Sequence, residues 1–364
     1  MIMKKFLLPL CIGMAITSLP AAACTGIVLK SDDGAVVPAR TMEFGFDVQS
    51  NIAMVPAGTE IKSLSSNPDK TGFVYKAKYG FGSANAFDRD IIVDGMNEKG
   101  LYYGAFYFAG VAKYSELTKE NQSQAVSSEE LGNYILANFA NIDEVKKGLE
   151  KITVVGTLIK EIGGIAPLHY AVTDANGDSI VIEYSKDGLK IHDNKLGVVT
   201  NPPAYDWHET HVRNFIGLSP ENTKPIEING VKLKGISQGT GMVGLPGDYT
   251  SPSRFVRAVT FVNSSLPSKD ADEAVFRAFH ILNAFDIPKG LIVENTDDGD
   301  FHDYTVWTSV SDTKNKDYYF KTYLTPQHMK LNIDDALKGL KAPKIIKMES
   351  THSYKDITGQ FSQK

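Results

Sequence analysis

AAACTGIVLK, residues 21–30, is the segment from which the rest of the sequence is interpreted. A run of three small residues ends at Ala23, and the residues after Cys24 have the pattern of a β-strand. Upstream lie a short positive segment and an apolar run, residues 6–19, that is too short to cross a bilayer. This order predicts a secretory signal peptide over residues 1–23 rather than a membrane anchor, since no stop-transfer pattern follows.

The cysteine count gives the next constraint. The chain has two cysteines, Cys11 and Cys24, and Cys11 lies in the predicted signal peptide. The mature chain, residues 24–364, would therefore keep one thiol and form no internal disulfide. We expect a secreted or periplasmic protein in which the single thiol, at the first residue, has a chemical role.

A cysteine at a new N-terminus carries both a thiol and a free α-amine. The α-amine has an ordinary pKa of about 7.7–8.0, so a useful fraction is neutral near neutral pH and can take the thiol proton. The thiolate is the attacking species, and the residue supplies its own base. The alternative from another class is a lipid-anchored binding protein without catalysis, in which Cys24 is acylated. Lipobox sequences usually have Leu where this chain has Ala21.

Composition and charge exclude several other classes of function. The 364 residues carry a formal net charge of −5 without a basic stripe, which argues against a nucleic-acid partner. No later apolar run is long enough to span a membrane. HETH, residues 208–211, is not the HExxH zinc motif, and DDGD, residues 297–300, lacks the later ligands of a calcium loop. We therefore predict neither a metal nor a cofactor.

Turn and periodicity signals predict an α+β chain with antiparallel sheets. Hairpins occur in two blocks with helices between them, and NGD at residues 176–178 is a strong hairpin signal. SSEE, residues 127–130, predicts a capping box at the start of a helix. Residues 188–192 and 196–200 are expected to continue a meander as neighbouring strands. We interpret residues 24–364 as one domain.

Several motifs follow one another along the mature chain. They are CTG at 24–26, RTMEF at 40–44, DGMNEKGL at 94–101, VTNPP at 199–203, LPGD at 245–248 and SPSRFVR at 251–257. In their order and spacing they resemble the choloylglycine hydrolase family of N-terminal nucleophile hydrolases, which includes bile salt hydrolases and penicillin V acylases. The resemblance implies a four-layer αββα sandwich.

The resemblance also implies roles for single residues. Cys24 matches the nucleophile, and Arg40 matches an arginine near the thiol. Asn201 matches an asparagine whose side-chain N–H stabilises the tetrahedral oxyanion, and Arg254 matches a second arginine of the active site. Glu43 stands where the family usually has Asp, a carboxylate that holds the α-amine of the nucleophile. The extra methylene would change the geometry of that contact.

Two further positions concern the substrate. Tyr107 stands where bile salt hydrolases usually have Asn and penicillin V acylases often have Tyr. Its backbone N–H would help to form the oxyanion hole, and its ring would shape the pocket. Phe44 is also expected to contact the substrate, whereas Phe106 and Phe108 are expected to be buried strand residues.

The activity implied by the resemblance is hydrolysis of a linear carbon–nitrogen amide through a thioester on Cys24. The partner is then a small-molecule N-acyl amide. Conjugated bile salts are slightly favoured by the long loop before Arg254, although Tyr107 favours penicillin V. N-acyl homoserine lactones are a further alternative, since all three compounds join an apolar acyl group to a small polar amine. In bile salt hydrolases that loop helps to assemble tetramers, so we expect a homotetramer.

Overall fold

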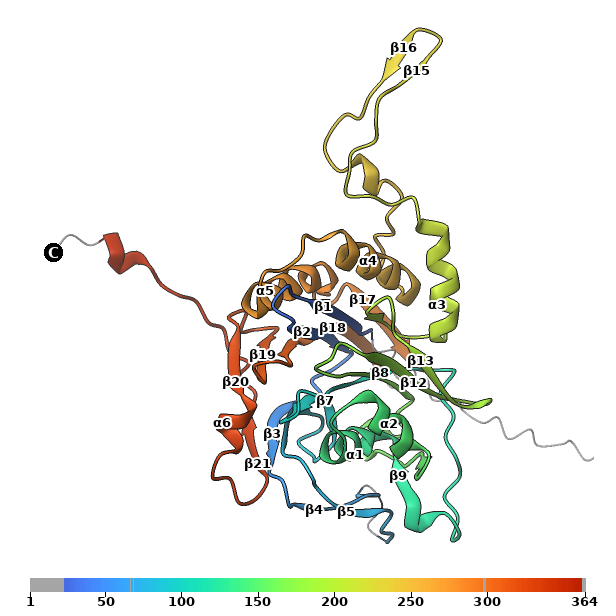
Figure 1. The fold of residues 1–364 in the computed structure, drawn as a ribbon, viewed down its shortest axis with the longest axis vertical. Helices are drawn as coiled ribbons and strands as arrows, with labels where there is room; N and C mark the ends of the chain where they lie inside the picture. The colour runs from blue at the N-terminus through green and yellow to red at the C-terminus, as the bar shows by residue number, and fades with distance from the viewer. Residues whose placement is uncertain (1–22, 66, 68, 297–298, 362–364) are drawn as a thin grey trace, which may run out of the picture.

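The computed structural model describes residues 23–65, 67, 69–296 and 299–361. Two large antiparallel β-sheets lie face to face, and helices cover the outer side of each (Figure 1). The α+β class and the four-layer αββα arrangement predicted from the sequence are confirmed.

The first sheet contains the N-terminal hairpin. Its order is β14 (Val198–Val199), β1 (Thr25–Lys30), β2 (Val36–Phe44), β18 (Gly299–Asp312), β19 (Asp317–Thr322) and β20 (Met329–Asn332), and β17 (Ile292–Thr296) pairs with β18. The turn between β1 and β2 has Gly34 at φ 83°, a backbone conformation that suits glycine. Every residue of β2 is buried, as expected for a strand with packed layers on both faces.

The second sheet lies against the first. Its order is β13 (Gly188–Asp193), β12 (Ser179–Ser185), β11 (Leu168–Thr173), β8 (Tyr102–Tyr107), β7 (Ile92–Asn97), β6 (Phe81–Asn85), β3 (Asn51–Val55) and β21 (Lys344–Lys347). Asp174 closes the β11–β12 turn, because its Oδ1 accepts the backbone N–H groups of Asn176 and Asp178. The hairpin predicted at NGD is thereby confirmed.

Most of the helices form the two outer layers, while the short helix at residues 333–337 contacts β20 of the first sheet and β3 and β6 of the second. They are α1 (Leu131–Asn138), α2 (Ile142–Leu149), α3 (Tyr205–His211), α4 (Ser251–Ser264), α5 (Ala271–Leu282) and α6 (Ile333–Leu337). α4 contacts β1, α5 contacts β1, β2 and β18, and α1 contacts β7 and β8. One apolar cluster joins the facing sides of the sheets with α4 and α5, and a second fills the space between the second sheet and α1 and α2. In the described ranges, none of the helices has both the length and the apolar character that a membrane span needs.

Shorter elements lie outside these layers. They are the antiparallel pair β4 (Glu60–Lys62) and β5 (Val74–Lys76), the parallel pair β9 (Ala125–Ser127) and β10 (Thr153–Val155), the hairpin β15 (Ile226–Ile228) and β16 (Val231–Leu233), and the 3-10 turns η1 (Gln122–Gln124), η2 (Ser128–Glu130), η3 (Lys160–Ile162), η4 (Val212–Phe215), η5 (Thr240–Met242), η6 (Asn283–Phe285) and η7 (Thr358–Phe361). The β15–β16 hairpin ends an arm, residues 217–249, that projects from the body of the molecule (Figure 1).

The arm presents an apolar face to the surroundings. Ile226 pairs with Leu233 and Ile228 pairs with Val231, so the four side chains lie on one face of the hairpin. Their exposed fractions are 58%, 48%, 52% and 59%. Apolar side chains gathered at this level of exposure are typical of a surface that contacts another protein.

Two local predictions are wrong. Ser127 makes no capping bond to the helix, and Glu130 instead accepts hydrogen bonds from the hydroxyls of Ser63 (2.6 Å) and Ser127 (2.5 Å). A buried carboxylate needs donors, and the neighbouring loop supplies them. Residues 196–200 do not continue the meander, since β14 pairs with β1 in the first sheet. A turn at Gly197, with φ 64°, precedes that change of sheet.

Candidate active site

Cys24 lies one residue before the Thr25–Thr41 pair that opens the β1–β2 ladder. Its side chain is 1% exposed and forms part of the wall of a cavity of about 60 Å³. Apolar side chains make up most of this wall, and Phe44 and Tyr107 are among them. The structure thus brings both predicted substrate residues to the same cavity as the thiol.

The guanidinium of Arg40 is buried next to Cys24. Its Nη2 donates to Cys24 Sγ over 3.0 Å, and its Nη1 donates to the carbonyl oxygens of Val93 (3.3 Å) and Ala105. Both carbonyls flank the end of the β7–β8 ladder, since Val93 precedes Asp94 and Ala105 follows Gly104 in the last pair. Arg40 therefore satisfies two strand carbonyls of the second sheet and reaches the thiol from the first.

Aromatic rings and a carboxylate compensate this buried charge. The Arg40 guanidinium lies 4.3 Å from the ring centroid of Phe106 and 5.3 Å from that of Trp307. Asp94 is also buried and accepts hydrogen bonds from two tyrosine hydroxyls at 2.6 and 2.7 Å. Burial alone would lower the pKa of Arg40, but Cys24 and Asp94 raise it, so the guanidinium keeps its charge.

The thiol of Cys24 is subject to opposing influences. Burial raises its pKa, whereas the charge of Arg40, the backbone N–H of Glu43 and the charge of Arg254 lower it. The net effect is a raised pKa in this form of the chain, in which Ala23 precedes Cys24. The nitrogen of Cys24 is here a peptide N–H, which can donate a hydrogen bond but cannot accept a proton.

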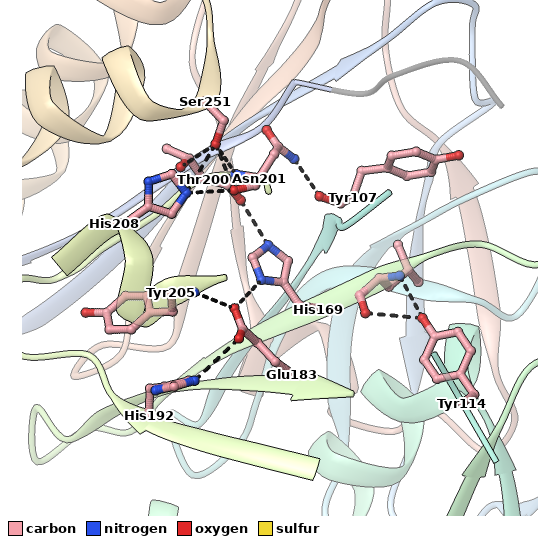
Figure 2. Close-up of polar contacts among 11 residues, drawn as sticks. Tyr107, Tyr114, His169, Glu183, His192, Thr200, Asn201, Tyr205, His208 and Ser251 are labelled. Carbon is pink, nitrogen blue, oxygen red and sulfur yellow. Dashed lines mark hydrogen bonds and ion pairs between the residues drawn. The ribbon is translucent and has the colours of Figure 1, made fainter. Parts of the chain in front are cut away.

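Asn201 connects the turn after β14 with both Cys24 and β8. Its Oδ1 accepts the backbone N–H of Cys24 over 2.6 Å and the Nη2 of Arg254 over 2.6 Å. Its Nδ2 donates to the carbonyl oxygen of Tyr107 over 2.9 Å (Figure 2). Because an amide nitrogen carries two N–H groups, a second donor remains for another acceptor.

Arg254, in the first turn of α4, holds the backbone of Cys24. Its Nη1 donates to the carbonyl oxygen of Cys24 and to Thr25 Oγ1, the latter over 3.0 Å. Burial lowers the pKa of Arg254, while Glu43 and Cys24 act in the opposite direction. Arg254 thus fixes Cys24 relative to Asn201, whereas Arg40 is the arginine that contacts the sulfur.

Glu43 is 1% exposed and has few partners. Thr305 Oγ1 donates to its Oε1 over 3.0 Å, and within the described residues its Oε2 has no hydrogen-bond partner. Burial raises the pKa of Glu43 to about 8, although Arg254 and Thr305 lower it. The nitrogen of Cys24 donates to Asn201, and no hydrogen bond joins it to Glu43 in this form of the chain.

The sequence did not indicate the residues that hold the turn at Asn201. Ser251 Oγ accepts the N–H of Asn201 (2.9 Å) and donates to its carbonyl oxygen (2.8 Å), and His208 Nε2 lies 2.9 Å from the same oxygen (Figure 2). A serine before a helix is usually a cap, so its sequence signal is weak. In the part of the chain that the structure describes, no group of three or more His, Cys, Asp or Glu side chains could hold a metal ion.

Comparison with protein families agrees with this arrangement. The family described as linear amide C–N hydrolases, choloylglycine hydrolase family, matches residues 24–345. The chain belongs to this family. The resemblance drawn from the sequence is confirmed, and the protein is a hydrolase of linear amides.

The relatives include a bile salt hydrolase/transferase and a penicillin V acylase. The chain is 32% identical over 303 residues to a bile salt hydrolase/transferase of Clostridium perfringens, covering 82% of this chain and 89% of that protein. It is 28% identical over 336 residues to a penicillin V acylase of Pectobacterium atrosepticum, covering 86% of this chain and 82% of that protein. The crystal structure of a mutant conjugated bile acid hydrolase from Clostridium perfringens matches with a TM-score of 0.81 and 29% identity, over 92% of this chain and 100% of that one.

The pKa of Glu43 leads to a prediction about stability. In the unfolded chain this carboxyl has its ordinary pKa of 4.5, and in the folded chain with Ala23 attached it has a pKa of about 8. The folded state therefore binds more protons between these values, and its free energy of unfolding falls as the pH rises through this window. Glu43→Gln is neutral throughout, so its free energy of unfolding should fall less steeply than that of the wild type.

Urea unfolding at several pH values measures both slopes in chains that retain Ala23. Glu227→Gln, on the exposed hairpin, controls for the loss of a carboxylate. If the free energy of unfolding fell with pH equally steeply in the wild type and in Glu43→Gln, the raised pKa of Glu43 would be contradicted.

Proposed function

We propose that the chain hydrolyses conjugated bile salts with Cys24 as the nucleophile, after removal of residues 1–23 in a secreted or periplasmic protein. The observation that carries this proposal is the 3.0 Å contact between Arg40 Nη2 and Cys24 Sγ in the wall of an apolar cavity. The family match begins at residue 24, which agrees with Cys24 as the first residue of the working enzyme.

Acylation begins with proton transfer within Cys24. The neutral α-amine takes the thiol proton, and the thiolate, paired with Arg40, attacks the carbonyl carbon of the amide. A carbon–sulfur bond forms, and the carbonyl electron pair moves to oxygen. The carbonyl then re-forms as the carbon–nitrogen bond breaks, and the leaving amine takes the proton from the α-ammonium. Water hydrolyses the resulting thioester, and the same α-amine carries the proton back to sulfur.

Two N–H groups are suited to stabilise the oxyanion. One is the second N–H of Asn201 Nδ2, and the other is the backbone N–H of Tyr107. The N–H of Phe108 donates to Pro167 over 2.7 Å, so in the alternating ladder the N–H of Tyr107 points away from β11. A single donor of this kind is typically worth about 2.7–4 kcal/mol in the transition state.

The choice of substrate rests on relatives and on the cavity. The relative of Clostridium perfringens at 32% identity is a bile salt hydrolase/transferase. The apolar wall around Cys24 suits an apolar acyl body. Tyr107 favours penicillin V as the alternative substrate, which agrees with the penicillin V acylase at 28% identity. N-acyl homoserine lactones share the same acyl chemistry, and the alternative without catalysis is a lipid-anchored binding protein.

Cys24→Ala should fold and release no amine from any substrate, and Cys24→Ser should be nearly inactive because a hydroxyl is far harder to ionise than a thiol. The measurement is free glycine, taurine, 6-aminopenicillanate or homoserine lactone released across a substrate panel. Activity of the alanine variant at the wild-type level would refute the mechanism. Intact mass of the secreted chain is the control, since a bare Cys24 terminus fits the enzyme and an acylated one fits the lipid anchor.

Tyr107→Asn should change substrate preference more than stability. The ring lines the cavity, lies edge-on to Phe44 at 6.2 Å, and has a buried hydroxyl that lacks a hydrogen-bond partner in the described structure. A lost ring contact is worth roughly ten- to two-hundredfold in relative kcat/KM, here in favour of bile salts over penicillin V. Kinetics on both substrates and a thermal melt check this. An unchanged ratio with an unchanged Tm would exclude Tyr107 from the substrate site.

We propose that four chains associate through the apolar face of the β15–β16 hairpin. Ile228→Asp combined with Val231→Asp places two charges on that face and should reduce the mass measured by light scattering to that of a smaller assembly. Glu227→Gln with Lys232→Gln, a pair on the opposite face, is the matched control and should keep the assembly. A tetramer in the aspartate variant would exclude this face from the interface.

A further inference from the structure

A chain of buried polar side chains leads from the second sheet to the turn at Asn201 (Figure 2). His169 on β11 points its Nε2 at the carbonyl oxygen of Thr200, 3.0 Å away. Its Nδ1 lies 3.4 Å from Oε1 of Glu183 on β12. His169 and Glu183 are each 2% exposed or less, so this pair is part of the interior.

Glu183 holds both ends of the turn. Through His169 it acts on Thr200, and its Oε1 also accepts the backbone N–H of Tyr205 over 2.9 Å at the start of α3. His192 Nε2 lies 3.4 Å from Oε2 of the same carboxylate. The single carboxylate thereby fixes the chain before and after Asn201.

Glu183 stays ionised in this position. Burial alone would raise its pKa, but the neighbouring imidazoles of His169 and His192 and the N–H of Tyr205 lower it to about 2. A carbonyl oxygen and a carboxylate only accept hydrogen bonds, so Nε2 donates to Thr200 and Nδ1 donates to Glu183. The orientation of the imidazole is further fixed by Phe108, whose ring stacks on it at 4.2 Å with an interplanar angle of 3°.

The hydrogen bonds of the Asn201 side chain depend on the position of its backbone. Its amide contacts Cys24, Arg254 and Tyr107 at distances of 2.6–2.9 Å, so a small shift of its backbone would disturb all three bonds. Turn residues have few ladder hydrogen bonds of their own, and Thr200 is held by His169 at its carbonyl oxygen and by Ser251 at its hydroxyl. A displacement of about 1 Å near reacting groups can cost on the order of a hundredfold in rate.

We propose that His169, oriented by Glu183, is a positioning residue for the oxyanion donor Asn201. The proposal rests on the proposed function, in which Asn201 stabilises the oxyanion. His169 touches neither the thiol nor the wall of the cavity in this arrangement. Its effect should therefore fall on the chemical step and leave substrate binding nearly unchanged.

Two variants test the pair. His169→Leu removes the donor to Thr200, and Glu183→Gln keeps the shape of the partner while removing its charge. Both should lower kcat about ten- to a hundredfold with KM within about twofold of the wild type. The readout is the amine released from a glycine-conjugated bile salt or from penicillin V, whichever the wild-type chain hydrolyses. Where His169→Leu does not fold, Glu183→Gln decides the question.

Glu130→Gln is the matched control. Glu130 is another buried carboxylate that accepts several hydrogen bonds, among them those of Ser63 and Ser127, and it lies outside the Asn201 network. It should lose stability in a thermal melt and keep its kcat. His169→Gln carries an amide N–H that can reach Thr200, so it should recover most of the activity lost in His169→Leu.

Asn201→Ala separates this proposal from the proposed function. If His169 acts through Asn201, adding His169→Leu to Asn201→Ala should cost little further rate. Wild-type kcat in Asn201→Ala would refute the oxyanion role and remove the basis of the proposal. A loss in Asn201→Ala with wild-type kcat in folded His169→Leu and Glu183→Gln would overturn the positioning role alone. Full additivity of the two losses would also overturn it.

Discussion

The burial of the Arg40 guanidinium between the two sheets is the constraint on which the site depends. An unpaired charge in the interior is costly, so each of its donors needs an acceptor. Its acceptors include two strand carbonyls at the open end of the β7–β8 ladder, the sulfur of Cys24 and the carbonyl oxygen of Thr41. Satisfying Arg40 therefore fixes the register between a strand of the first sheet and two of the second, and it places the thiol at that junction.

The turn at Asn201 gives the site its second fixed point. β14 leaves the meander and pairs with β1, which brings Asn201 beside Cys24 from 177 positions along the chain. Arg254 reaches the same place from α4 over a separation of 230 positions. The proposed nucleophile, the proposed oxyanion donor and the second arginine thus come from three separate segments, two at neighbouring strands of the first sheet and one on α4. A displacement of any one of these segments would therefore shift the reacting atoms relative to one another.

The sequence predicted the layers of the fold better than the contacts between its elements. Cys24, Arg40, Asn201 and Arg254 were proposed from motifs, and in the structure each of the other three forms a hydrogen bond with Cys24. The sheet that β14 joins was predicted wrongly, since two buried valines fit either sheet equally well. His169 could not be recognised in advance, because its partner Thr200 lies 31 positions away on another element. Periodicity describes which face of a strand is buried and says nothing about which distant carbonyl a side chain will meet.

Glu43 connects the proposed cleavage with the electrostatics of the site. With Ala23 attached, the nearby Cys24 nitrogen is uncharged. Burial raises the pKa of the Glu43 carboxyl to about 8, so it is largely protonated at lower pH. On the proposed removal of residues 1–23, that nitrogen becomes an amine that can carry a proton. A cation beside a buried carboxyl favours its ionised form, and the carboxylate in turn stabilises the ammonium that forms when the amine takes the thiol proton. One peptide-bond cleavage would then create both the base and the group that holds it, so the uncleaved chain would contain the nucleophile without the means to ionise it.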